Sequence, residues 1–297
     1  MRGTVPLRLR GLIHLLGQRT WLMGVVNVTP DSFYGGSRTP DPERAVARGM
    51  ELVGQGADIL DIGGESSRPG SDPVSAAEER LRVVPVISGL RRQSGVFLSV
   101  DTTKREVAQA AVEAGADIIN DISALRFDAG LLEWVASSGA AVVLMHMLGT
   151  PKTMQAAPRY ADVLAEVRSF LVERTAAAAA AGLGADRTIL DPGIGFGKRP
   201  EDNLTLLNRL TDLAELGRPI MVGPSRKSFL GAILDLPAEE RLEGTLAAAV
   251  LAVARGAHIL RVHDVEAVRR AVRTAEAVLA EKVEPSRPGR SEARHAG

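Results

Sequence analysis

Eight short apolar runs recur along this 297-residue chain, and each leads into a polar or charged residue. Runs of this length between turn residues are typical of strands buried on both faces of a parallel sheet. The runs are Trp21–Val26, Ala57–Leu60, Val96–Val100, Asp117–Ile119, Ala140–Met145, Thr188–Leu190, Pro219–Val222 and Ala257–Leu260. Eight parallel strands with polar groups at their carboxyl ends predict an α/β fold, the (β/α)8 TIM barrel, with an active site at that end.

The segments between these runs have the ends expected of helices. Asp41 and Pro42 supply an N-cap and a first-turn proline, and Thr103–Glu106 has the spacing of a capping box. Two long helices are predicted at Tyr160–Ala181 and Arg241–Arg255. Several strands follow directly on a glycine that can end a helix in the left-handed conformation. These glycines are Gly56, Gly115, Gly139 and Gly256.

Length and composition favour one domain with a short extension at its start. The hydrophobic content of 45% is enough for a large core. Residues 1–19 precede the first barrel strand, and Leu7–Arg19 can form a hairpin over the bottom of the barrel. The barrel itself is expected over residues 20–283. Residues 284–297 are rich in Pro, Ser, Arg and Gly, and we expect this tail to be disordered.

Composition also restricts the partners. A formal net charge of +0 and an aromatic content of 3% argue against a nucleic-acid-binding surface. The chain has no cysteine, which fits a cytoplasmic enzyme. No apolar stretch approaches the ~18 residues that span a bilayer. We therefore expect small-molecule substrates, no nucleic acid and no membrane. The wide apolar surface of the helix at Arg241–Arg255 makes a homodimer plausible.

The residues at the strand ends are of types that bind ligands and catalyse reactions. They are Asn27, Asp61, Asp101, Asn120, Asp121, His146, Asp191, Ser225, Arg226, Lys227, Arg261, His263 and Asp264. A single carboxylate at such a place could equally cap a helix, and Asp61, Asp121 and Asp264 keep this structural interpretation. For His146, a hydrogen bond within the core is favoured over catalysis.

Several loops at the same end suit an anionic ligand. In Gly63–Gly70 the glycines allow close backbone approach, Ser67 offers a hydroxyl, and Arg68 presents a planar donor pair. Cations follow the last two strands, where barrels often bind phosphate. The glycines of Asp191–Lys198 do not have the spacing of a dinucleotide or ATP loop.

Seven motifs together closely resemble the dihydropteroate synthase family. They are Asn27–Phe33, Gly64–Gly70, Ser99–Thr102, Met145–Met147, Asp191–Lys198, Ser225–Ser228 and Arg261–Asp264. The resemblance runs from about Trp21 to about Ala280, and the motifs keep the family's order and spacing. It implies a transferase that condenses 6-hydroxymethyl-7,8-dihydropterin diphosphate with 4-aminobenzoate, giving 7,8-dihydropteroate and pyrophosphate.

The resemblance also assigns roles to residues of this chain. It makes Asp101 and Lys227 catalytic, with Asp101 stabilising a cation on the pterin methylene. A carboxylate can pair with the guanine-like edge of a pterin through two N–H donors. The residues implied to bind the pterin are Asp101, Asn120, Met145, Asp191, Phe196 and Lys227. Those implied to bind the diphosphate are Asn27, Ser67, Arg68, Arg261 and His263.

The same resemblance implies a metal ion and a second substrate pocket. Asn27 matches the ligand of Mg²⁺, the expected cofactor, which neutralises the leaving group. The residues implied to bind the aminobenzoate are Phe33, Pro69, Lys227 and Ser228. The family is usually a homodimer and is a target of sulfonamides.

Some positions depart from the family pattern, and two alternatives stay open. Ser67 stands where the family commonly has Thr, Leu148 replaces a usual Gln, and residues 34–37 differ in the first loop. One alternative is another pterin-binding barrel of the methyltetrahydrofolate methyltransferase type. That type needs no residues that bind aminobenzoate or pyrophosphate, so the presence of Arg68 and Lys227 argues against it. The other is a noncatalytic paralogue that binds a pterin.

Overall fold

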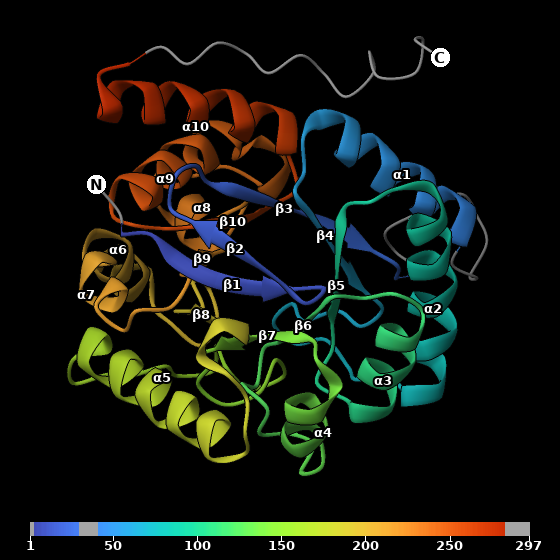
Figure 1. The fold of residues 1–297 in the computed structure, drawn as a ribbon. Coiled ribbons are helices and arrows are strands. Elements are labelled where there is room, and N and C mark those ends of the chain that lie inside the picture. The colour runs from blue at the N-terminus through green and yellow to red at the C-terminus, as the bar shows by residue number, and fades with distance from the viewer. Residues whose placement is uncertain (1–2, 30–40, 283–297) are drawn as a thin grey trace, which may run out of the picture.

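The computed structural model describes residues 3–29 and 41–282, and its centre is a parallel barrel of eight strands (Figure 1). The strands are β3 (Trp21–Asn27), β4 (Ile59–Gly63), β5 (Phe97–Asp101), β6 (Ile118–Asp121), β7 (Ala141–Met145), β8 (Thr188–Asp191), β9 (Met221–Val222) and β10 (Ile259–Val262). Their order is β8-β7-β6-β5-β4-β3-β10-β9, and a parallel bridge between Leu190 and Ile220 joins its two edges. The predicted (β/α)8 barrel is confirmed.

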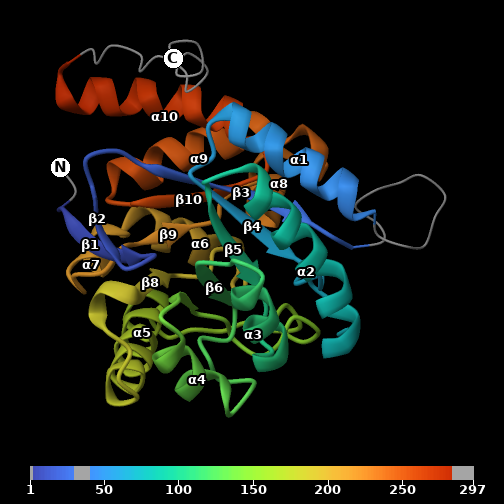
Figure 2. The ribbon, with the colours of Figure 1, turned by 45° about the vertical axis from the view of Figure 1, so that its right-hand side comes forward.

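Helices surround the strands on the outside of the barrel (Figure 2). They are α1 (Pro42–Gln55), α2 (Ala76–Gln93), α3 (Arg105–Glu113), α4 (Leu131–Ser138), α5 (Val163–Ala180), α6 (Pro200–Asn208), α7 (Thr211–Ala214), α8 (Ser228–Leu234), α9 (Leu242–Ala254) and α10 (Val265–Ala280), with short 3-10 turns η2 (Ala185–Arg187) and η3 (Ala238–Glu240). The Asp41 side chain caps α1, and Gly56 ends it in the left-handed conformation, as predicted. The capping box predicted at Thr103–Glu106 is wrong, because the Arg105 amide donates to Asp128 instead.

The hydrophobic core has two layers. In the larger one, the outward faces of the strands pack against the helices, as Leu60 and Val100 do with Val83 and Ile87 of α2. The smaller one fills the amino-terminal half of the barrel interior. Alternate residues of a strand point to opposite faces, so each strand serves both layers.

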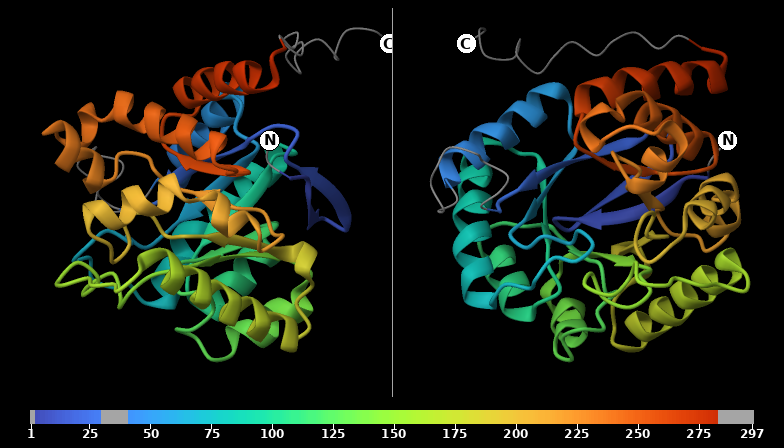
Figure 3. Two further views of the ribbon diagram at one scale, coloured as in Figure 1. Left: turned by 90° about the vertical axis from the view of Figure 1, so that its left-hand side faces the viewer. Right: turned by 180° about the vertical axis from the view of Figure 1, so that it is seen from behind.

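A β-hairpin closes the amino-terminal end of the barrel. It consists of β1 (Val5–Leu9) and β2 (Leu12–Leu16), which pair antiparallel. Leu7, Leu9 and Leu16 are at most 1% exposed and join the inner core layer. Figure 3 shows the hairpin beyond one end of the strands. The carboxyl ends of the strands, where the polar residues stand, lie at the other end.

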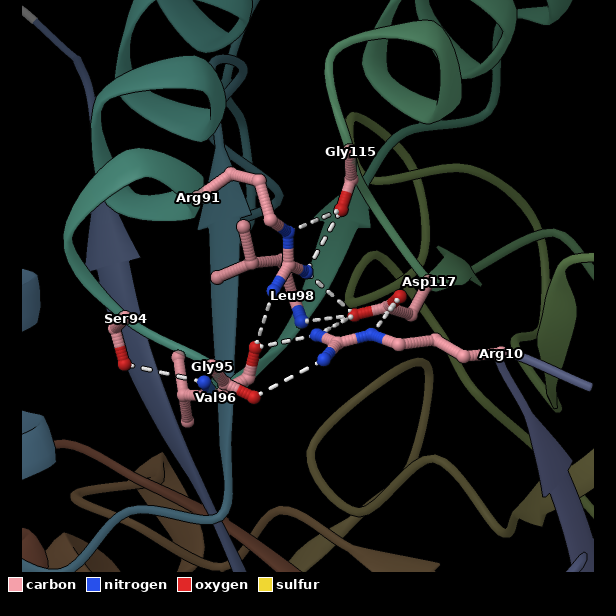
Figure 4. Close-up of polar contacts among 8 residues, drawn as sticks. All are labelled: Arg10, Arg91, Ser94, Gly95, Val96, Leu98, Gly115 and Asp117. Atoms are coloured by element: carbon pink, nitrogen blue, oxygen red, sulfur yellow. Dashed lines mark hydrogen bonds and ion pairs between the residues drawn. The ribbon is translucent and has the colours of Figure 1, made fainter. Parts of the chain in front are cut away.

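Arg10 at the hairpin turn ties this closure to the barrel (Figure 4). Its Nε lies 2.8 Å from Asp117 Oδ1, and its Nη2 donates to the carbonyl of Val96. Asp117 also accepts from Arg91 Nη2 at 2.7 Å and from the Leu98 amide at 2.9 Å. The carboxylate therefore joins the hairpin, α2 and the start of β5 in one polar network.

Two predicted segments lie outside the residues that the structure describes. They are the tail at 284–297 and the first-loop residues 30–40. Among the residues that are described, no helix combines the length and the apolar character needed to cross a membrane.

Candidate active site

Arg261 lies at the centre of the site, between two carboxylates. Its Nε is 2.7 Å from Asp61 Oδ2, and its Nη2 is 2.8 Å from Asp101 Oδ2. Burial raises the pKa of Asp101 to about 7, and the charge of Arg261 opposes that increase. Although burial lowers the pKa of Arg261, the two carboxylates outweigh it and raise the pKa above its usual value. The guanidinium therefore stays charged.

Parallel strand pairing brings these groups together. The register aligns Asn27 with Gly63, Gly63 with Asp101, and Asp101 with Asn120, across four neighbouring strands. Asn120 Nδ2 donates to Asp61 Oδ2 at 3.0 Å. The structural role predicted for Asp61 takes a form other than helix capping, because its carboxylate is fully buried and accepts hydrogen bonds from both Asn120 and Arg261.

Asp191 ends β8 on the opposite side of the mouth. Its side chain is 3% exposed, and its Oδ1 accepts from the Gly193 amide at 2.6 Å. Burial raises the pKa of this carboxyl to about 6, and the Gly193 amide opposes the increase. Met145 pairs with Asp191 in register. Met145 and Phe196 pack together in a small apolar cluster with Ile122, Met147 and Met154.

The loop from Asp191 to Lys198 can follow its path only because of its glycines. Gly193 has a φ of +70°, and a Cβ there would lie 1.9 Å from the His146 carbonyl oxygen. The loop brings the Phe196 ring under Lys227, whose Nζ is 4.0 Å from the ring centroid. Burial and the nearby Arg261 lower the pKa of Lys227 to about 8.

His263 lies beside Ser225 on the side of β9 and β10. The Ser225 Oγ is 3.0 Å from His263 Nδ1. Burial and Arg261 lower the pKa of His263 to about 4, so the imidazole is neutral at pH 7. Arg226 pairs with Asp264 at 2.6 Å, which gives Asp264 a structural role.

The remaining predicted site residues lie at the rim. Asn27 and Ser67 are half-buried, whereas Arg68, Pro69 and Ser228 are exposed. The loop after β4 is held by Lys104, whose Nζ bridges Glu65 at 2.7 Å and Glu79 at 2.5 Å. Phe33, the remaining predicted aminobenzoate residue, lies outside the described residues.

The arrangement thus has a deep part and a rim. The deep part offers carboxylates, an amide and apolar side chains, which suit a flat heterocycle with N–H donors. The cations between the deep part and the rim suit an anion. Nothing in the sequence indicated a role for Lys198 or the ion pair between Asp61 and Arg261. Asp61 carried a signal, since it follows an apolar strand as Asp101 does.

Comparisons with known proteins agree with this geometry. The family model described as "Pterin binding enzyme" matches residues 23–263. Dihydropteroate synthase of Escherichia coli is 46% identical over 261 residues, covering 88% of this chain and 92% of that protein. A solved structure of Xanthomonas albilineans dihydropteroate synthase with 4-aminobenzoic acid has a TM-score of 0.87 at 50% identity, covering 94% of this chain and 99% of the other.

A second structure of the Xanthomonas albilineans enzyme, in complex with 7,8-dihydropteroate, has a TM-score of 0.82 at 46% identity. The match covers 93% of this chain and 99% of the chain in that structure. Both the family match and the identity extend over nearly the whole barrel, and the polar residues of the site lie within that span. The chain belongs to the dihydropteroate synthase family of pterin-binding enzymes.

Proposed function

We propose that this chain condenses 6-hydroxymethyl-7,8-dihydropterin diphosphate with 4-aminobenzoate to form 7,8-dihydropteroate and pyrophosphate. The observation that carries the proposal is the contact of Arg261 with Asp101, at 2.8 Å. It puts a group suited to the leaving diphosphate directly beside a carboxylate suited to a cation on the pterin. The relatives named dihydropteroate synthase support the same reaction.

The pterin would bind in the deep part of the site. Asp191 would accept two hydrogen bonds from its amide and amino edge, while Asn120 and Lys227 would contact the other polar ring atoms. The apolar sides of Met145 and Phe196 would pack on the ring. All but Lys227 are at most 8% exposed, so these contacts would form away from water.

Bond breaking comes first in the proposed mechanism. The C–O bond to the diphosphate breaks with its electron pair, which leaves a cation on the methylene that Asp101 stabilises. Arg261, His263, Ser67 and Arg68 would bind the departing diphosphate. His263 would do so through an imidazole N–H, and the charge of the diphosphate would raise the pKa of His263 above its value of about 4.

Mg²⁺ fits this end of the site. The Asn27 side chain offers an amide oxygen, and a Cβ at Gly63 would lie within 4 Å of both that oxygen and Asp101. No three His, Cys, Asp or Glu residues are grouped for a metal in the described part of the chain. A hard cation held by one amide oxygen, water and diphosphate oxygens is typical of Mg²⁺. When bound, it supplies charge neutralisation of the diphosphate.

The aromatic amine then attacks the cation and loses one proton to solvent. Phe33 and Pro69 would enclose the aminobenzoate ring, and Lys227 with Ser228 would bind its carboxylate. Ser228 begins α8 directly after Lys227, so both groups reach the same side of the mouth. A methyltransferase-type barrel would need neither the cations nor this second pocket.

We also propose that two copies of the chain form a homodimer through α8 and α9. Ile233 and Leu251 on these two helices are each 56% exposed, so both are available for apolar contacts with a second copy. Sedimentation at micromolar concentration would detect the dimer, and a monomer there would contradict it. The cytoplasmic location expected from the sequence stays a prediction, which cell fractionation would check.

A coupled assay for pyrophosphate release tests the proposed reaction. Release over many turnovers should require both substrates and Mg²⁺, and dihydropteroate should form in equal amount. Release that continues over many turnovers without 4-aminobenzoate would indicate a hydrolase, in which water attacks the cation. Pterin binding with no turnover would indicate the noncatalytic paralogue.

A further inference from the structure

Lys198 ends the loop after β8, and its ammonium group is buried beneath the pterin site. The residue is 3% exposed. Its Nζ lies 2.9 Å from the Gly193 carbonyl oxygen, 3.0 Å from that of Phe196 and 3.0 Å from His146 Nδ1. The His146 carbonyl oxygen is also near, at 3.3 Å. Burial lowers the pKa of Lys198 to about 7, and the charge of Asp191 opposes the decrease. The ammonium form is therefore stable only where such acceptors replace water.

The donor count for the charged form of Lys198 assigns the state of His146. In that form Lys198 has three N–H donors, and the three shortest contacts use all of them. His146 Nδ1 must then accept, which puts the imidazole proton on Nε2. Burial and, after it, the Lys198 charge lower the pKa of His146 to about 2, in agreement with a neutral acceptor. The imidazole edge also meets the Phe170 ring, with centroids 4.9 Å apart.

These contacts close the loop on itself. The Gly193 and Phe196 carbonyls belong to the segment that carries the Asp191 carboxylate at one end and the Phe196 ring at the other. His146 follows β7, and its amide donates to the Asp191 carbonyl at 3.0 Å. One side chain therefore fixes the two ends of the loop and joins it to the neighbouring strand.

We propose that Lys198 is a positioning residue for the pterin, which acts with His146 to hold Asp191 and Phe196 in the geometry that binds the ring. This inference rests on the proposed function. Lys198 does not itself touch the substrate, because its three N–H donors already bond to protein acceptors and its side chain is buried. This role accounts for the burial of Lys198 and His146, neither of which takes part in the proposed reaction.

The first test replaces Lys198 with methionine, which has a similar length and no charge. Three buried acceptors would lose their donor, and the KM for the pterin diphosphate should rise by at least about tenfold. The affinity for inorganic pyrophosphate with Mg²⁺ should stay within about twofold, since the residues proposed to bind it lie on other loops. A general loss of structure would change both values together.

His146 provides a second test that does not depend on the folding of the lysine variant. His146→Asn keeps an acceptor near the position of Nδ1, whereas His146→Leu removes it. We expect the Asn variant to keep pterin affinity within about threefold and the Leu variant to lose about tenfold. His258→Leu is the matched control, because His258 is also a buried histidine but lies at the closed end of the barrel.

The outcomes separate this inference from the proposed function. Wild-type protein without pterin-dependent turnover would contradict the proposed function itself. An active wild type whose Lys198→Met variant keeps its pterin KM would overturn the positioning role alone. Equal pterin losses in His146→Leu and His258→Leu would overturn it as well.

Discussion

Arg261 donates to Asp101 across the mouth of the barrel, so the cation proposed to bind the diphosphate and the carboxylate proposed to be catalytic share one hydrogen bond. An incoming diphosphate would compete with Asp101 for this donor. Asp61 keeps Arg261 anchored through Nε during that exchange, at 2.7 Å. Binding of the leaving group would thus free the carboxylate that stabilises the cation formed when the group leaves.

Asp101→Asn tests charge stabilisation directly. The variant keeps the size of the side chain and deletes the negative charge, which matters most in the transition state. Turnover should fall by ~10²-fold or more, as when one preorganised electrostatic group is lost. The Michaelis constants should change far less. A single-turnover rate within a few-fold of wild type in a quenched-flow measurement would reject this role.

The pH profile should follow the ionisation of Asp101. Its carboxylate must be charged to act, so kcat/KM for the pterin diphosphate should rise with pH through about 7. Arg261 lowers that pKa, so Arg261→Gln should move the rise to higher pH. Substrate ionisation is the same for both proteins and cancels in the comparison. An unchanged midpoint in the variant would mean that another group controls the profile.

Asp191→Ala should abolish pterin binding without unfolding the barrel. In the proposed complex the carboxylate would pair with donors of the ring in a buried pocket, and its removal would leave those donors unpaired at a cost of about 2–5 kcal/mol. Calorimetry with a pterin ligand measures the loss, and circular dichroism checks the fold. Near-wild-type affinity would show that Asp191 is not the pterin anchor.

Binding of 4-aminobenzoate should depend on whether a diphosphate is already bound at the rim loop. Ser67, Arg68 and Pro69 share one rim loop, so a diphosphate held by Ser67 and Arg68 would fix Pro69 at the aminobenzoate pocket. The affinity for 4-aminobenzoate or a sulfonamide should therefore increase when pyrophosphate and Mg²⁺ are present. Equal affinity in both conditions would rule out this coupling.

The sequence was sufficient to predict the barrel and the end that carries the site. Apolar runs reveal strands wherever they occur, and the parallel arrangement then brings Asp101, Asn120 and Asp191 to one mouth without further information. Side-chain contacts between segments far apart in the sequence could not be predicted from the sequence. The Arg105 amide is capped by Asp128, and Asp61 is joined to Arg261 200 positions away. Such pairs depend on side-chain directions that no local pattern encodes.

The hairpin that seals the amino-terminal end makes the barrel interior a dead end. Every reactant and product must pass through the same opening between the strand ends. If Asn120 and Asp191 hold the heterocycle below Ser67 and Pro69, as proposed, the heterocycle would have to arrive first, and the aminobenzoate would then cover it. The finished product would leave with its outer ring first. A molecule that occupies only the rim would trap whatever lies beneath it.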